Sequence, residues 1–93
     1  SPLFVAYELE SAEPTSKVNL FFSAPREAPT TRGFAAILHE GLDGLTAQEI
    51  LDVPTDFAHA LGLDRAVSAL RMRGMCAMLF RVQKGIKAKL ASA

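Results

Sequence analysis

The order of the hydrophobic patterns is the feature that most limits what this chain can fold into. Residues 3–10 are rich in strand-forming residues and partly alternate between apolar and polar, and residues 17–23 alternate again, so both segments are predicted to be β-strands. The six residues between the two segments include Pro14, which cannot continue a strand ladder. An antiparallel hairpin is therefore expected. Two strands alone are only marginally stable in water, so helices from the rest of the chain must cover one face of the hairpin.

The first helix is expected after a loop that carries two prolines. Pro29 suits the first turn of a helix, and the helix should run over residues 30–40 and end at Gly41. Gly33 lies inside it at a cost of about 1 kcal/mol relative to alanine, which suggests that the backbone there approaches a neighbour such as the hairpin. Three apolar residues are expected on the buried side of this helix: Phe34, Ile37 and Leu38.

Two short helices should follow. Thr46 and Glu49 have the spacing of a capping box, in which the hydroxyl and the carboxylate each bond an amide at the helix start. The helix that they begin should end near Asp52. Thr55 is the candidate cap of a second short helix over residues 56–61.

The last helix should be the longest. Ser68 is its candidate cap, and helical spacing of apolar residues continues over residues 70–90. The expected stripe consists of Met75, Met78, Leu79, Val82, Ile86 and Leu90. Strands followed by helices predict an α+β fold, in which a small antiparallel β-sheet packs against helices, with residues 1–93 forming a single domain.

The net charge of zero hides an uneven distribution. Residues 8–64 hold all ten acidic residues and three of the basic ones, whereas residues 65–93 hold seven basic residues and no acid. Attraction between the two packed halves is the ordinary interpretation. The sharper alternative is a basic helix that binds an acidic partner or nucleic acid. No apolar run approaches the roughly 18 residues that span a bilayer, so we expect no membrane segment.

The chain has one cysteine, Cys76, which excludes an internal disulfide and a CxxC pair and fits a cytoplasmic protein. Its neighbours on the helix are apolar, so we expect a buried, inert thiol that labels slowly. Met72, Met75 and Met78 should belong to the core. Lys84, Lys87 and Lys89 should form the solvated face of the last helix. His39 and His59 are expected at the surface or at helix ends.

Four segments, in this order, resemble the SufE family. Residues 1–5 resemble the strand that follows the Cys-Gln-Ser loop of that family. Residues 20–37 are similar to its strand–loop–helix segment, although Glu27 is the one acid kept from the family's Gly-Asp-Ser-Asp loop. Residues 45–50 are close to its Thr-Pro-x-x-Ile segment, and residues 70–78 resemble its Arg-x-x-Gly-Leu-x-x-Met helix start.

The resemblance implies a SufE/NifU-like two-layer architecture and a function. SufE proteins accept sulfur from a cysteine desulfurase (SufS-like), carry it as a persulfide on one loop cysteine, and deliver it to an Fe–S scaffold complex (SufBCD-like). They need no metal and no cofactor for this, and they are accessory proteins, not stand-alone enzymes. A homodimer is left open.

By the same resemblance the sulfur-carrying cysteine would lie two positions before Ser1, and the N-terminal helices of the family would precede it. We therefore expect the chain to be the C-terminal two thirds of a longer protein. Arg71 corresponds to the family's arginine that tends to face the sulfur-carrying loop, where a guanidinium favours a thiolate or binds a partner carboxylate. The candidate partner-binding residues are Arg71, Glu27, Ser1 and Arg32.

Two other functions compete with this hypothesis. A scaffold of the NifU type needs three cysteine-like ligands to hold a cluster, and this chain supplies one. A nucleic-acid-binding domain would use the basic last helix, but interleaved aromatic residues and a recognition motif are missing. We therefore expect no nucleic-acid partner.

Overall fold

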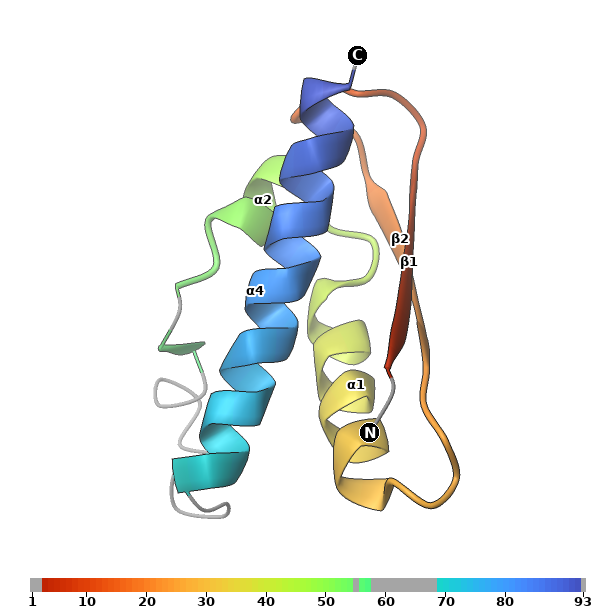
Figure 1. Cartoon of the computed structure of the whole chain (residues 1–93). Coiled ribbons are helices and arrows are strands. Elements are labelled where there is room, and N and C mark those ends of the chain that lie inside the picture. The colour runs from red at the N-terminus through yellow and green to blue at the C-terminus, as the bar shows by residue number, and fades with distance from the viewer. Residues whose placement is uncertain (1–2, 55, 58–68, 93) are drawn as a thin grey trace.

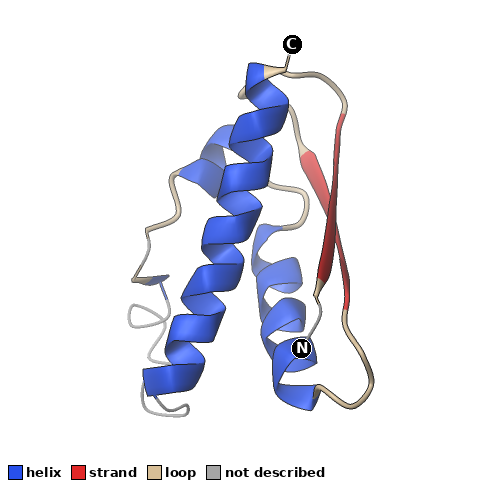
Figure 2. Ribbon diagram, viewed as in Figure 1, coloured by secondary structure: helices blue, strands red, loops and turns tan. Residues whose placement is uncertain are grey.

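The computed structural model describes residues 3–54, 56–57 and 69–92. An antiparallel hairpin of β1 (Phe4–Leu9) and β2 (Val18–Ser23) comes first, and helices follow it (Figures 1 and 2). The described helices are α1 (Pro29–Leu42), α2 (Ala47–Leu51) and α4 (Ala69–Ala91). The α+β fold expected from the sequence is confirmed. Several expectations fall on residues outside the described ones: the cap at Thr55, most of the helix expected over 56–61, His59 and the cap at Ser68.

The hairpin has one buried face and one exposed face. The register runs from Phe4 opposite Ser23 to Leu9 opposite Val18. On the inner face Val18 and Leu20 are fully buried, whereas the outer face leaves Phe4 exposed. Because side chains alternate between the faces of a strand, a register shifted by one residue would expose the whole inner set.

The helices cover the inner face of the hairpin, which gives two layers (Figure 1). Helix α1 packs on β2, α4 packs on β1, and α2 packs on α4. The largest fully buried side chains come from every layer: Val18, Leu20, Leu38, Ile50, Met75, Leu79, Val82 and Ile86. Helix α2 begins with the predicted capping box, because Thr46 Oγ1 accepts a hydrogen bond from the Glu49 amide and the Thr46 amide donates to Glu49 Oε1.

Helix α1 departs from the sequence expectation at its end and on one side. It passes through Gly41 and ends at Leu42, and the chain turns at Gly44, whose φ of 84° is the left-handed conformation that favours glycine. Ile37 is 40% exposed, so its predicted burial is wrong. Each residue advances about 100° around a helix, which places Ile37 about 60° beyond Phe34, on the side away from Leu38 and outside the buried side. Four residues make up that buried side: Phe34, Ala35, Leu38 and Leu42.

The close backbone approach expected at Gly33 is found at Gly85 instead. A Cβ atom added at Gly33 would meet no atom within 4 Å. A Cβ atom added at Gly85 would lie 2.5 Å from both Cζ and Oη of Tyr7. Glycine at this position of α4 therefore lets the tyrosine ring of β1 lie directly on the helix backbone.

The burial and pairing expected for the charged residues and the cysteine are confirmed only in part. Lys84, Lys87 and Lys89 are exposed, as predicted. Among the side chains that the structure describes, no lysine or arginine forms an ion pair with a carboxylate. Cys76 is half-buried where burial was expected, while Met72 and Met75 are buried in the core. Of the described helices, none combines the length and the apolar character that crossing a bilayer requires.

Candidate functional site at the open end of the hairpin

Helix α4 holds the start of β1 in place. Nη1 of Arg81 donates a hydrogen bond to the Leu3 carbonyl at 2.7 Å. The Tyr7 hydroxyl donates to the Arg81 carbonyl at 3.2 Å. Arg81 thus contacts Leu3, the residue before β1, through its side chain and Tyr7 of β1 through its backbone. The start of β1 is therefore fixed to helix α4.

The Tyr7 hydroxyl is kept as a neutral donor. Burial raises the pKa of Tyr7 above its ordinary value of 10.0, and the nearby positive charge of Arg81 offsets part of that increase. A protonated phenol is what the hydrogen bond to the Arg81 carbonyl requires. This contact is therefore maintained at neutral pH.

Two of the predicted site residues lie near the open end of the hairpin. Phe4 stands opposite Ser23, so the first described residues of the chain lie beside the last residue of β2. Glu27 is exposed in the loop that follows β2, and Arg32 is exposed in the first turn of α1. The loop after β2, the start of α1 and the beginning of β1 therefore lie toward one end of the molecule (Figure 1).

The other two predicted site residues are placed less fully. Arg71 belongs to the first turn of α4, and its side chain is outside the described part of the structure. Helix α4 begins at the same end of the molecule as α1 (Figure 1). Ser1 lies outside the described residues.

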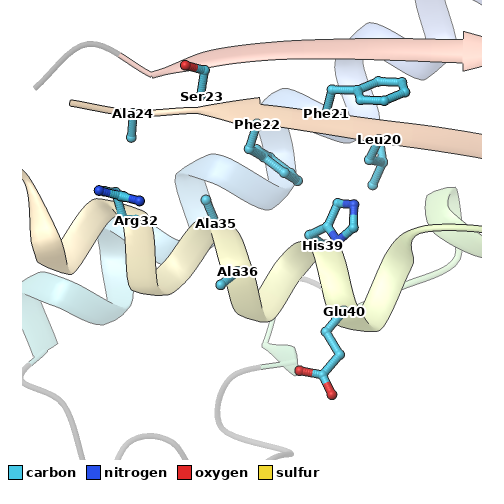
Figure 3. Close-up of a pocket in the computed structure, with 10 residues that line it drawn as sticks. All are labelled: Leu20, Phe21, Phe22, Ser23, Ala24, Arg32, Ala35, Ala36, His39 and Glu40. Atoms are coloured by element: carbon cyan, nitrogen blue, oxygen red, sulfur yellow. The ribbon is translucent and has the colours of Figure 1, made fainter. Parts of the chain in front are cut away.

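A groove of about 650 Å³ opens between β2 and α1 (Figure 3). One wall is formed by residues 20–24, and the other consists of residues along one side of α1. Of the predicted site residues, Arg32 lines this groove. The His39 ring meets the Phe22 ring edge to face, with centroids 6.4 Å apart and planes at 78°. The Nε2 atom of His39 also lies 3.8 Å from Asp43 Oδ2.

Sequence reasoning missed three residues that join the helices to the hairpin. Arg81 and Gly85 stand four residues apart and together receive Tyr7. Asp43 accepts a hydrogen bond from the Leu20 amide through Oδ1 at 2.7 Å and so ties the end of α1 to β2. Only the spacing of Arg81 and Gly85, which places both on one face of a helix, was visible in the sequence. That Tyr7 contacts them could not be seen in the sequence.

The SufE model, described as an Fe–S metabolism associated domain, matches residues 1–86. The chain belongs to the SufE family. An uncharacterised SufE-like protein of Mycobacterium tuberculosis is 52% identical over 87 residues, which are 94% of this chain and 59% of that protein. SufE-like protein 1 of Arabidopsis thaliana, a chloroplastic and mitochondrial protein, is 39% identical over 66 residues, which are 71% of this chain and 18% of that protein.

A solved structure supports the SufE-like fold. The solution structure of a hypothetical protein from Thermus thermophilus is similar to the SufE chain with a TM-score of 0.79 and 38% identity, over 98% of this chain and 64% of that one. The SufE chain thus spans less than two thirds of the length of these relatives. In the described part of the molecule, no three His, Cys, Asp or Glu side chains gather as a metal-binding group.

Proposed function

We propose that the full-length protein is a sulfur acceptor of Fe–S metabolism. It takes sulfur as a persulfide from a cysteine desulfurase and passes it to an Fe–S cluster scaffold. The family match over residues 1–86 is the observation that carries this proposal. The anchored start of β1, beside the exposed Glu27 and Arg32, supports it, because a carrier needs a defined strand leading to an accessible loop.

The reach of the chain agrees with such a loop. The position two residues before Ser1 stands five positions before Phe4. Five residues of extended chain span at most about 17 Å. A cysteine there would remain within that distance of Phe4, which stands opposite Ser23 at the end of β2. The thiol would therefore stay within reach of the end of β2, where the β2–α1 loop begins.

The proposed transfer needs only a thiolate. The carrier thiolate attacks the terminal sulfur of the desulfurase persulfide, a new S–S bond forms on the carrier, and the desulfurase cysteine leaves as a thiolate. No oxidant or reductant is consumed, because one S–S bond replaces another. A nearby guanidinium such as that of Arg71 would favour the ionised thiol, and Glu27, Arg32 and Ser1 would contact the desulfurase.

The test compares the full-length protein with the 93-residue chain in a cysteine desulfurase assay. The full-length protein should raise desulfurase turnover and gain a persulfide, detected by mass spectrometry, at the cysteine two positions before Ser1. The 93-residue chain should do neither. A full-length Cys76→Ser variant should behave like the unmodified protein, which separates the two thiols. A full-length protein that neither stimulates the desulfurase nor gains sulfur would contradict the proposal.

A further inference from the structure

The outer edge of β2 is paired over only part of its length. The Val18 amide donates to the Leu45 carbonyl at 2.8 Å, and the Leu20 amide donates to Asp43 Oδ1 at 2.7 Å. In an antiparallel strand, alternate residues direct their backbone groups to the same edge. The Leu20 carbonyl and both backbone groups of Phe22 therefore also point to this outer edge. The described residues supply no hydrogen-bond partner for these three groups.

The groove between β2 and α1 runs along this unpaired stretch. Arg32, Ala36, His39 and Asp43 follow one another at helical spacing, so they share one side of α1. Asp43 is the residue that reaches the outer edge of β2, which means that this side of the helix faces that edge. A strand edge beside a helix is an arrangement in which an extended peptide can add to a sheet and lay side chains against the helix.

The charge of the groove is uneven. The Arg32 guanidinium lies near Ala24 and forms no ion pair with a described residue (Figure 3). Glu40 also lines the groove, but its carboxylate points away from β2 (Figure 3). At the other end, Nε2 of His39 lies 3.8 Å from Oδ2 of Asp43. An extended ligand would therefore meet an uncompensated positive charge at the Ala24 end, which a carboxylate complements.

We propose that this groove binds an extended segment of a partner protein. The segment adds to the outer edge of β2, where it donates to the carbonyls of Leu20 and Phe22 and accepts from the Phe22 amide. It places an acidic side chain against Arg32. Main-chain pairing supplies affinity in this mode, and the acidic position supplies selectivity. This binding does not depend on sulfur transfer, because no thiol takes part.

The probe is a six-residue peptide in which valine and threonine alternate and the last residue is aspartate. Its N-terminal amine carries fluorescein, and its C-terminal carboxyl group is amidated. Fluorescence anisotropy measures its affinity for the 93-residue chain, and nitrogen-15 amide spectra locate it. Addition of the peptide should shift the Phe22 amide in a saturable way. Arg32→Gln should weaken binding by about tenfold or more, since a charge-assisted hydrogen bond is lost. Arg26→Gln, an exposed arginine that does not line the groove, should leave the affinity unchanged.

Two changes in the peptide complete the design without touching the protein. Replacement of its aspartate by asparagine should weaken binding as much as Arg32→Gln does. Methylation of its central backbone amides should abolish binding, because the carbonyls of Leu20 and Phe22 lose their donors. Circular dichroism of both arginine variants controls for folding. The proposal is overturned if the Phe22 amide does not shift at millimolar peptide, or if Arg32→Gln and Arg26→Gln bind equally well.

Discussion

The contact of Tyr7 with Gly85 gives the sharpest test of the fold, through Gly85→Ala. The added Cβ atom would lie 2.5 Å from Cζ and Oη of Tyr7, so the ring must move by about 1 Å to reach ordinary contact distance. Overpacking of this kind costs about 1–3 kcal/mol, and loss of the Tyr7–Arg81 hydrogen bond adds about 0.5–1.5 kcal/mol. Alanine returns up to about 1 kcal/mol through its better helix propensity. The net expectation is a loss of about 0.5–3.5 kcal/mol.

Gly74→Ala is the matched control in the same helix. A Cβ atom at Gly74 meets nothing within 4 Å, so this variant should gain up to about 1 kcal/mol. Urea unfolding followed by circular dichroism measures both, and the melting temperature should shift by about 4–8 °C per kcal/mol in a domain of this size. In a Tyr7→Leu background, Gly85→Ala should lose its cost and behave like the control. The reasoning is refuted if the two glycine variants have the same stability, or if the cost at Gly85 survives removal of the ring.

Three further changes test other contacts. Thr46→Ala removes the hydroxyl of the capping box and should lower the free energy of unfolding, measured in urea, by about 1 kcal/mol. Hydrogen bonds from Thr46 lower the pKa of Glu49. The stability that this carboxylate contributes should therefore be lost as the pH falls through its folded-state pKa. Burial raises the pKa of Tyr7, so the contribution of the neutral phenol to the free energy of unfolding is complete below the ordinary value of 10.0 and is lost as the pH rises through the folded-state pKa. Ultraviolet titration of this single tyrosine should show phenolate forming at higher pH in the folded chain than in urea. Equal titrations would contradict this. Leu79→Ala should cost about 2–5 kcal/mol because the side chain is 1% exposed, whereas Phe80→Ala, at 61% exposure, should change stability by less than about 0.5 kcal/mol; equal losses in calorimetry would show that this face of α4 is assigned wrongly.

Local signals made most of the fold predictable. The alternation of β2 puts residues two apart on one face, and Val18 and Leu20 are indeed both buried on the inner face. The capping box at Thr46 is also local, because both of its hydrogen bonds join residues three apart. The end of α1 is different. The chain leaves the helix after Leu42 because Asp43 bonds to β2 and Leu45 pairs with it, and neither contact can be inferred from the residues next to Gly41.

The site was less predictable for the same reason. Glycines 33, 74 and 85 all sit inside helices, and a single sequence does not tell which of them faces another element. The answer depends on how α4 is rotated about its axis, which the buried stripe of Leu79, Val82 and Ile86 fixes only in combination with the hairpin. Arg81 likewise resembles the other basic residues of the helix until Leu3 is placed beside it.

The proposed sulfur-carrying loop and the proposed peptide groove would act on the same partner protein. The groove would dock the partner, and the loop would exchange sulfur with it. The groove ends at Ala24, and Ser23 is paired with Phe4, from which the proposed thiol position is at most about 17 Å away. A partner strand held along β2 would therefore keep its protein near the thiol while the sulfur moves. If this is so, Arg32→Gln in the full-length protein should raise the concentration of carrier needed for half-maximal desulfurase stimulation and leave the maximal rate unchanged, because it weakens docking and not the exchange step. A fall in the maximal rate alone would instead place Arg32 beside the reacting sulfur atoms.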